Sequence, residues 1–369
     1  MGPDAIEERV SKVAVFHSGQ RYRVLLGEGL LKQLGEYARK ILFCSTCAVI
    51  SDNNVASRFA DGVKRSLTSA GFQSILITIP AGEKSKTLKQ ASAICEQMIA
   101  AGLDRQSFVI GLGGGVIGDI SGFVAAIYHR GIPHIQIPTT LLAMVDSSIG
   151  GKTGVNTADG KNLIGAVHQP SLVIDDLDVL KTLPRREFNQ GFAEIIKHAI
   201  IADAKMFDML QSWEARSPRR PLALQQLICR NIKIKAKIVG EDERDRTGKR
   251  ALLNFGHTVG HAIERAGNYG KFLHGEALSL GIVAACAVSI KRAGLSSQQR
   301  EAVVDLLQQF DLPTKLPKHF SRGKIFNALK FDKKFEGGKI RFVVTPKIGA
   351  ALIATDVTLS DIREAVAAL

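Results

Sequence analysis

The first half of the chain is constrained most by a regular alternation of short apolar runs with segments of helical period. The runs are rich in Val, Ile and Leu, and six are expected as strands: residues 22–26, 47–51, 74–79, 107–112, 134–138 and 172–175. Residues 54–70 and 87–101 between them follow the helical period. Because strands that are apolar on both faces need cover on both, this alternation predicts a mostly parallel sheet with helices packed over it.

After about residue 180 the pattern becomes helical. Five stretches follow the helical period, namely residues 187–202, 221–239, 249–266, 275–292 and 297–309, and only residues 340–344 and 351–355 are expected to be extended. We therefore expect an α/β N-terminal domain at residues 1–180, with a Rossmann-like nucleotide-binding sheet, and a mainly α-helical C-terminal domain at residues 181–369. No long flexible linker is seen, so the predicted active site lies in a cleft between the domains.

Composition narrows the class of protein. The first twelve residues mix acidic and basic side chains where a signal peptide needs an apolar stretch. The longest candidate for a membrane span, residues 277–290, is uncharged but too short to cross a bilayer. Five cysteines without framework spacing favour a reducing compartment, so a soluble cytoplasmic protein is expected. The net charge of +14 comes with only 6% aromatic residues and no long basic run. This favours an anionic small molecule over nucleic acid.

A glycine-rich segment at residues 111–119, GLGGGVIGD, follows a predicted strand and opens a predicted helix. Gly113, Gly115 and Gly118 match the GxGxxG pattern in that context. Glycines let backbone amides approach a pyrophosphate, and the N-terminus of a helix favours negative charge. The alternative interpretation is a merely tight strand-to-helix turn, since the acidic residue usual about twenty positions downstream is absent.

Two upstream segments could replace that acidic residue. Asp52 to Asn54 stand at the end of one predicted strand, and Glu83 and Lys86 lie in the turn after the next. Nucleotides bind at the carboxyl ends of the strands in open parallel sheets. Both segments therefore favour a nucleotide site at this edge.

A second candidate region runs from residue 138 to residue 156 and continues to Asn162. Its Gly150-Gly151-Lys152-Thr153 is similar to a P-loop, but the glycine required six positions before the lysine is Asp146, which rejects a Walker site. Small residues here accompany Thr139, Thr140, Asp146, Lys152, Lys161 and Asn162, a set suited to holding a phosphate beside a nucleotide. The alternative is a surface loop with solvated lysines.

The predicted helices of the second half carry a set of metal-ligating residue types. Glu194 precedes Lys197 and His198 by one turn, His257 and His261 are four apart, and His274 starts another helix. Residues three or four apart share a helix face, and a carboxylate with imidazoles is typical of a catalytic zinc or similar ion. A single histidine on an apolar helix is more often a core residue. The spacing leaves open which histidines are ligands.

Several long motifs resemble those of the 3-dehydroquinate synthases, a family of sugar phosphate cyclases. They occur in the same order: GGGVIGD, HRGIPHIQIPTTLLAMVDSSIGGKTGVN, GKNLIGA, LPRREFNQGFAEIIKH, DER, NFGHTVGHAIE, LHGEALSLG and FDKK. The resemblance covers the chain from about residue 26 to residue 369. It implies a lyase that converts 3-deoxy-D-arabino-heptulosonate 7-phosphate to 3-dehydroquinate and phosphate in the shikimate pathway of aromatic amino acid biosynthesis.

The resemblance also implies roles for individual residues. The divalent metal, zinc or cobalt, is expected on Glu194, His257 and His274, with His261 near the substrate phosphate. NAD contacts are expected from Asp52, Asn54, Glu83, Lys86, Gly114, Gly115, Val116, Asp119, Thr139, Thr140, Asp146, Lys152, Lys161 and Thr182. Substrate contacts are expected from Lys152, Asn162, Lys197, Lys235, Arg250 and Asn254, with one or both of Lys333 and Lys334 at the carboxylate. Arg130 is expected to reach the phosphate of the neighbouring subunit, which implies a homodimer.

The implied mechanism uses NAD catalytically: transient oxidation, phosphate elimination, re-reduction, ring opening and intramolecular aldol closure. Three alternatives are weighed against it. A sibling cyclase for a neutral sugar phosphate has no carboxylate for Arg250 to bind. A metal-dependent polyol dehydrogenase releases NADH and needs no phosphate anchor. A nonenzymatic basic binding protein explains only the charge.

Overall fold

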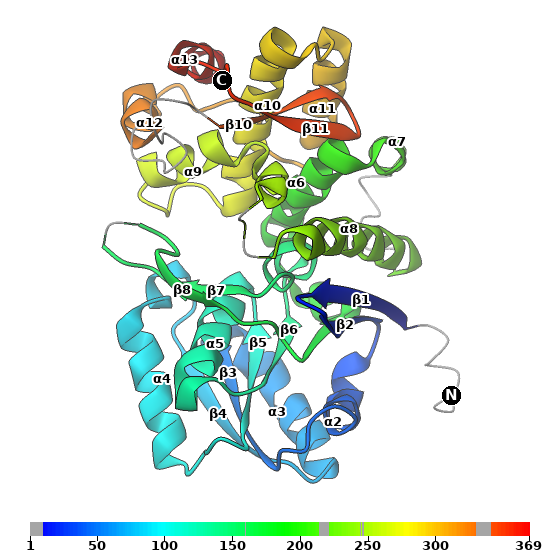
Figure 1. The fold of residues 1–369 in the computed structure, drawn as a ribbon, viewed down its shortest axis with the longest axis vertical. Coiled ribbons are helices and arrows are strands. Elements are labelled where there is room, and N and C mark those ends of the chain that lie inside the picture. The colour runs from blue at the N-terminus through cyan, green and yellow to red at the C-terminus, as the bar shows by residue number, and fades with distance from the viewer. Residues whose placement is uncertain (1–9, 159, 214–220, 244, 246, 330–340) are drawn as a thin grey trace. The chain divides into compact units, whose positions relative to one another are not determined.

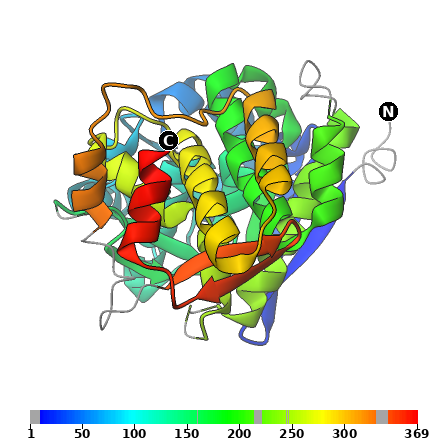
Figure 2. The same ribbon diagram turned by 90° about the horizontal axis from the view of Figure 1, so that it is seen from above.

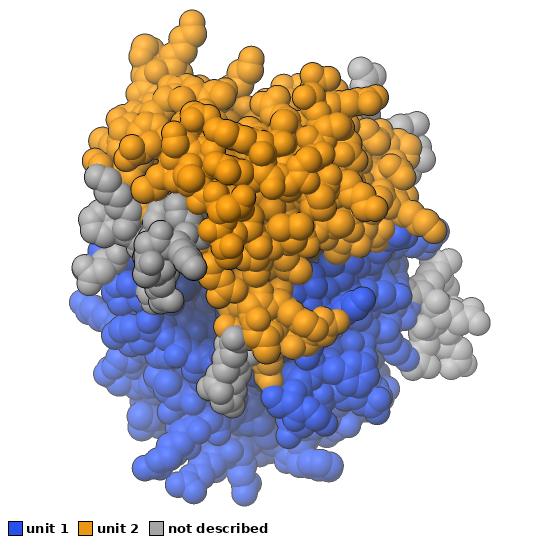
Figure 3. Space-filling model, turned by 45° about the horizontal axis from the view of Figure 1, so that its top comes forward, with its two compact units in different colours: residues 1–183, 221–240 blue, residues 184–220, 241–369 orange. Residues whose placement is uncertain are grey.

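A computed structural model describes residues 10–158, 160–213, 221–243, 245, 247–329 and 341–369 (Figure 1). Lys333 and Lys334 lie outside the described residues. The chain divides into two compact units, coloured separately in Figure 3: unit 1 comprises residues 1–183 and 221–240, and unit 2 comprises residues 184–220 and 241–369. Most of the long helix α8, Pro221–Glu241, thus belongs to unit 1, whereas the sequence pattern groups it with the helical second half.

Unit 1 is built on a seven-stranded sheet. In spatial order its strands are β1 Ser11–His17, β2 Gln20–Gly27, β9 Leu172–Asp176, β6 His134–Pro138, β5 Phe108–Gly113, β3 Thr46–Asp52 and β4 Gln73–Ile79. All neighbouring pairs are parallel except β1 with β2. The six predicted strands and the parallel sheet are confirmed. Strand β1 was not predicted, because it is an edge strand with alternating exposed and buried residues and carries no continuous apolar run.

Helices cover both faces of this sheet. The helices α2 Leu34–Arg39 and α3 Asn53–Ser69 pack on one face through residues such as Leu34 and Val63. On the other face lie α4 Leu88–Ala100 and α5 Gly115–Ile127, which contribute Ile94 and Ile117. Strand β3 feeds both cores alternately, since Val49 points into the first and Ile50 into the second. This two-sided burial is why the strands read as continuous apolar runs.

Unit 2 is mainly helical, as predicted. Its elements are α6 Arg185–Ala202, α7 Ala204–Gln211, the 3-10 helix η6 Lys249–Asn254, α9 His257–Ala266, α10 His274–Ala293, α11 Ser297–Gln309, α12 Arg322–Leu329 and α13 Leu359–Ala367. The strands β10 Phe342–Lys347 and β11 Ala350–Ala354 form an antiparallel hairpin, which confirms the two extended segments. Figure 2 shows α10 (yellow) between α11 (gold) and α13 (red). Within the described residues, none of the helices combines the length and apolar character that a membrane span requires.

The single helix predicted over residues 249–266 is wrong. The segment is split into η6 and α9 at Gly256, whose φ of 78° is left-handed and cannot continue a helix. Apolar periodicity survives across the break, so the pattern alone does not reveal it. A short hairpin in the polar loop region of unit 1 was also not predicted; it pairs β7 Lys152–Val155 with β8 Ile164–Val167.

Two glycines of α10 allow its close approach to α6 and α9. A Cβ on Gly275 would lie 2.1 Å from the backbone oxygen of Gln190 in α6. A Cβ on Gly281 would lie 2.1 Å from the backbone oxygen of Gly256, immediately before α9. Any side chain at either position must push the helices apart, because packed backbones have no room to yield. These contacts set the spacing of the three helices that carry Glu194, His257 and His274.

The first prediction concerns this spacing. Gly281→Ala should destabilise the protein by about 3 kcal/mol or more, because the added methyl meets backbone. Gly323→Ala is the matched control, since a Cβ there meets nothing closer than 3.7 Å, and it should stay within about 1 kcal/mol of wild type. Urea unfolding monitored by circular dichroism measures both. An equal effect of the two substitutions would contradict the packing argument.

Candidate active site

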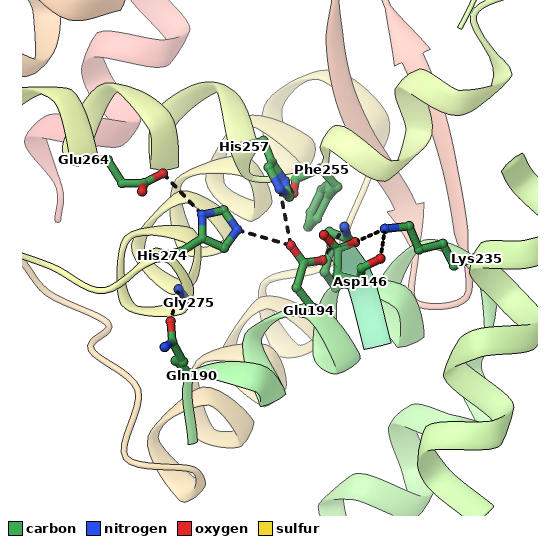
Figure 4. A network of polar contacts seen from close by, with 10 residues as sticks. Asp146, Gln190, Glu194, Lys235, Phe255, His257, Glu264, His274 and Gly275 are labelled. Carbon is green, nitrogen blue, oxygen red and sulfur yellow. Dashed lines mark hydrogen bonds and ion pairs between the residues drawn. The ribbon is translucent and has the colours of Figure 1, made fainter. Parts of the chain in front are cut away.

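A buried carboxylate from α6 is met by two imidazoles from α9 and α10. His257 Nε2 lies 3.3 Å and His274 Nε2 lies 3.4 Å from the same oxygen, Oε1 of Glu194. Ligand atoms of these three residues lie within 4.8 Å of one another, and Glu194 is fully buried. Figure 4 shows both rings directed at the carboxylate. The structure thus brings the three sequence-predicted metal ligands together in unit 2.

Lys197, one turn after Glu194 on α6, pairs with the other carboxylate oxygen, Oε2. Burial alone would raise the pKa of Glu194, but the nearby Lys197 ammonium and the histidines hold this pKa well below its usual range. Burial and Lys197 lower the pKa of His257. Burial opposes protonation of His274 as well, yet its hydrogen bonds to Glu194 and Glu264 raise its pKa to about 10. The cluster therefore contains an ionised carboxylate at neutral pH.

In both histidines the Nδ1 atom faces a second acceptor. His257 Nδ1 lies 3.3 Å from the backbone oxygen of Phe255, and His274 Nδ1 lies 3.2 Å from Glu264 Oε2. A neutral histidine that donates from Nδ1 presents an unprotonated Nε2, which is the form that binds a metal. A metal ion bound here would therefore displace the second proton that His274 carries at neutral pH. An oxygen and two imidazole nitrogens converging in this way fit a divalent zinc or cobalt ion with open coordination positions.

The remaining predicted residues of unit 2 lie near this cluster in the chain or in space. Arg250 is buried on η6, where Nη1 donates to the backbone oxygen of Glu243 at 2.7 Å. Asn254 ends the same 3-10 helix, three residues before His257. The ring of the exposed His261 lies 5.1 Å from that of His257, centroid to centroid. His261 is therefore a neighbour of the two histidines.

Unit 1 gathers its predicted nucleotide residues at the carboxyl edge of the sheet. The sheet order reverses between β3 and β5, which is where doubly wound sheets bind nucleotides. Asp52 ends β3, and the glycines after β5 begin α5 at Gly115, with Gly114 as its N-cap. A Cβ on Gly114 would lie 3.2 Å from the side chain of Thr140, which follows β6. The absence of side chains here leaves the first amides of α5 approachable by an anionic pyrophosphate.

Asp52 also has a structural role at this edge. Its Oδ1 accepts hydrogen bonds from the amides of Asn54 and Val55 at 2.9 and 3.1 Å and so caps α3. Thr182, at the end of the 3-10 helix Leu177–Thr182, donates to the backbone oxygen of Val179 at 3.0 Å. These contacts hold the two polar residues at the ends of their elements.

Lys86 is the centre of a polar network in unit 1. It is 3% exposed, and its ammonium pairs with Asp119 of α5 and donates to Oδ1 of Asn162 at 2.5 Å. Burial raises the pKa of Asp119 while Lys86 opposes the rise. Glu83 accepts from Nδ2 of Asn156 at 2.8 Å. The network joins three predicted NAD residues to Asn162, a predicted substrate residue.

Asp146 and Lys235 form a second link in unit 1. Lys235 of α8 donates to the backbone oxygen of Asp146 at 2.6 Å and to its Oδ1 at 2.5 Å (Figure 4). Asp146 belongs to a π-helical turn, Ala143–Ser147, after β6.

The remaining predicted residues of unit 1 include Lys152 and Arg130, whose side chains are exposed. The backbones of Arg130 and Asn162 are both in the left-handed region, at φ 71° and 57°.

Two residues of these networks, Glu264 and Asn156, were not predicted from the sequence. Glu264 follows His257 by seven positions on α9, so two helical turns place both on one face, and this spacing could have revealed it. Asn156 lies within the quoted GKTGVN motif and accepts from the amide of Asn162 at 3.0 Å through its side chain. No residue spacing connects Asn156 to Glu83, which is 73 positions away.

Two family models together match most of the chain. Residues 76–190 match the model of the N-terminal domain of 3-dehydroquinate synthase, and residues 191–335 match that of its C-terminal domain. A 3-dehydroquinate synthase of Symbiobacterium thermophilum is 43% identical over 354 residues, 95% of this chain and 98% of the relative.

Two solved structures are similar over nearly the whole chain. A 2-deoxy-scyllo-inosose synthase complexed with carbaglucose-6-phosphate, NAD+ and Co2+ has a TM-score of 0.86 at 25% identity, covering 96% of this chain and 99% of that one. The 2-epi-5-epi-valiolone synthase ValA of Streptomyces hygroscopicus subsp. jinggangensis, with NAD+ and Zn2+ bound, has a TM-score of 0.86 at 29% identity, covering 94% and 96%.

The second prediction tests the Lys86 network. Lys86→Met should destabilise the protein by about 3 kcal/mol at pH 7, because it leaves the Asp119 carboxylate without its counter-charge. Removing both charges, with Lys86→Met and Asp119→Asn together, should recover more than half of the loss. Urea unfolding measures the three free energies of unfolding, and a double variant as unstable as the single one would contradict the pairing.

The pH dependence provides a further check on that variant. Burial raises the pKa of Asp119 above the value near 4 of an unfolded aspartate. Stability from such a group is full below the unfolded pKa and is lost as pH rises through the folded pKa. Lys86→Met should therefore cost less at pH 4 than at pH 7, and the double variant should lose this dependence.

Proposed function

The chain belongs to the 3-dehydroquinate synthase family, and we propose that it converts 3-deoxy-D-arabino-heptulosonate 7-phosphate to 3-dehydroquinate and phosphate with NAD and a divalent zinc or cobalt ion. The reaction is a phosphate-eliminating lyase step of the shikimate pathway. The observation that carries the proposal is the buried Glu194 carboxylate with two imidazole Nε2 atoms at one oxygen and the Lys197 ammonium at the other. We expect the enzyme to work in the cytoplasm.

The residues present fit both cofactors. The oxygen and two nitrogens of Glu194, His257 and His274 would hold the metal, and the glycine turn before α5, with the Lys86 and Asp119 pair, would hold NAD. When bound, NAD would accept a hydride from a substrate carbon and return it, while the metal would polarise the oxygen attached to that same carbon.

In this proposal, different polar and charged side chains bind the phosphate and the carboxylate of the substrate. Lys152, Asn162, Lys197 and His261 would bind the phosphate, joined by Arg130 from the second subunit of a homodimer. The buried guanidinium of Arg250 would bind the carboxylate as a planar fork, with Asn254 beside it. Lys235, held by Asp146, would also contact the substrate.

These residues would mainly bind and orient, and the leaving phosphate would take up the proton that elimination releases. Lys197 illustrates why, because its ammonium already neutralises a buried carboxylate and is held at a fixed position. Ring closure then needs confinement of a reactive enolate from water more than further acid-base groups.

A sibling cyclase for a neutral sugar phosphate is the main alternative, since both solved structures above bear such names. The sequence relation favours the acid, at 43% identity to a 3-dehydroquinate synthase against 25% and 29% to those two cyclases. The buried Arg250 supports the same assignment, because its planar guanidinium fork matches a carboxylate, and a neutral sugar phosphate offers none.

The third prediction tests the reaction class. Phosphate release from 3-deoxy-D-arabino-heptulosonate 7-phosphate should require NAD+, stop on chelation and return with zinc or cobalt. Absorbance at 340 nm should show no accumulation of NADH, because the hydride returns to the substrate. Glu194→Gln should lower the zinc content measured by elemental analysis. Full activity in metal-free protein would contradict the metal assignment, and stoichiometric NADH would favour a polyol dehydrogenase.

The fourth prediction concerns substrate choice. Arg250→Ala should lower kcat/KM for the seven-carbon acid by roughly 30-fold to several thousand-fold, the effect of about 2–5 kcal/mol for losing one partner of a buried charge pair. Arg250→Lys should recover only part, because a point charge cannot replace the fork. Zinc content and NAD+ affinity should stay near wild type.

The matched control is Arg186→Ala, an exposed arginine on α6 that pairs with Glu276 and should leave kcat/KM near wild type. Unchanged kinetics of Arg250→Ala, together with turnover of glucose 6-phosphate or sedoheptulose 7-phosphate by the wild-type protein, would favour a sibling cyclase.

A further inference from the structure

A second carboxylate lies behind one of the two clustered histidines. Glu264, on α9, is 4% exposed, and its Oε2 is 3.2 Å from Nδ1 of His274. The opposite ring nitrogen of His274, Nε2, faces Oε1 of Glu194 at 3.4 Å. The imidazole therefore stands between two buried carboxylates, as Figure 4 shows.

We propose that Glu264 is a positioning residue that keeps the proton of His274 on Nδ1 and so presents Nε2 to the metal. The inference rests on the proposed metal site of Glu194, His257 and His274. A hydrogen bond from the outer nitrogen of a ligating histidine to a carboxylate sets the ring orientation and increases the basicity of the inner nitrogen.

His274 needs such a partner more than His257 does. The side chain of His274 is 28% exposed, against 11% for His257, so packing restrains the His274 ring less. His274 is also the first residue of α10, after a connection in which Asn268 and Tyr269 are both left-handed. Because His274 stands at the very start of α10, the hydrogen bond with Glu264 of α9 supplies the restraint that holds its ring.

Glu264 also links the two ligand helices. Glu264 follows His257 by seven residues on α9, while His274 is the first residue of α10. A side chain of α9 therefore orients the metal-ligand histidine of α10. The proposed ligand on α9, His257, has a different acceptor at its Nδ1, namely the backbone oxygen of Phe255. A backbone oxygen is set by the fold, whereas the Glu264 acceptor depends on the residue at one position.

The same residues allow a different arrangement, in which Glu264 is itself a ligand. Ligand atoms of His261, Glu264 and His274 also lie within 4.8 Å of one another. The first cluster is favoured because its carboxylate is fully buried and two Nε2 atoms meet one of its oxygens. His261 is exposed, and its ring centroid is 6.1 Å from that of His274.

The fifth prediction measures zinc affinity by competition with a chelating dye, and the coordination of Co2+ by its visible absorption spectrum. Glu264→Ala should weaken zinc binding about 10- to 100-fold, because the outer acceptor is lost. Glu264→Gln keeps an acceptor oxygen at the same length, and it should stay within about 5-fold of wild type because only the charge is removed. The Co2+ spectrum should change in Glu264→Ala and return toward wild type in Glu264→Gln.

Glu276→Gln is the matched control for the start of α10. Glu276 accepts from the amide of Leu273 at 2.8 Å and pairs with Arg186, so its loss should affect stability without changing the zinc affinity. Melting of the metal-free proteins, followed by circular dichroism, measures this structural effect separately. If Glu264→Ala does not fold, the zinc affinities of Glu264→Gln and Glu264→Asp provide the test. The aspartate side chain is one methylene shorter and lies farther from His274, so Glu264→Asp should bind zinc more weakly than Glu264→Gln.

Zinc affinity unchanged in Glu264→Ala, or reduced equally in Glu276→Gln, would overturn the inference. So would loss of zinc from Glu264→Gln and His261→Ala with retention in His257→Ala, because Glu264 would then be a ligand. A wild-type protein that binds zinc with these variant effects, yet releases no phosphate from the sugar acid, would contradict the proposed activity and leave this inference intact.

Discussion

The buried charge of Glu194 is the constraint on which the helical unit depends. An ionised carboxylate with no exposure is costly unless opposite charge or hydrogen-bond donors surround it. Lys197 and the two histidines supply this compensation from three helices. Those helices can meet at the required distances because Gly275 and Gly281 admit the backbones of α6 and α9. The packing of small residues and the chemistry of the cluster are thus parts of one arrangement.

The α/β unit also contains a buried charge that must be compensated, the ammonium of Lys86. This ammonium is almost completely buried at the edge of the sheet, and it is compensated by Asp119 from α5 and by Asn162 from the loop between β7 and β8. In unit 1 Lys86 joins residues from separate elements, whereas in unit 2 Lys197 pairs with Glu194 on the same helix and the two histidines bring in the other helices. Each ion pair fixes polar groups whose positions would otherwise depend on long flexible side chains, and so each prepares a rigid surface for an anionic ligand.

Periodicity predicted an element best where the whole element has one kind of surroundings, such as a strand that is buried on both faces. The strands β3, β5 and β6 were recognised because burial on both faces favours runs of mostly apolar residues. The half-exposed edge strand β1 was missed, and η6 and α9 were merged because apolar spacing continues across Gly256. The assignment of α8 to the helical half followed chain order, whereas its contacts group it with the sheet of unit 1.

The sequence by itself determined the α/β and helical plan, the glycine turn before α5, the family, and the residue types from which a metal site could be made, because local periodicity and motif spacing are properties of neighbouring residues. Only the tertiary structure decided that two Nε2 atoms meet one oxygen of Glu194, that Lys86 reaches Asn162, and that Glu264 stands behind His274. Glu194 and His274 are 80 positions apart. Their meeting depends on how closely helices pack, and no local pattern of side chains encodes that distance.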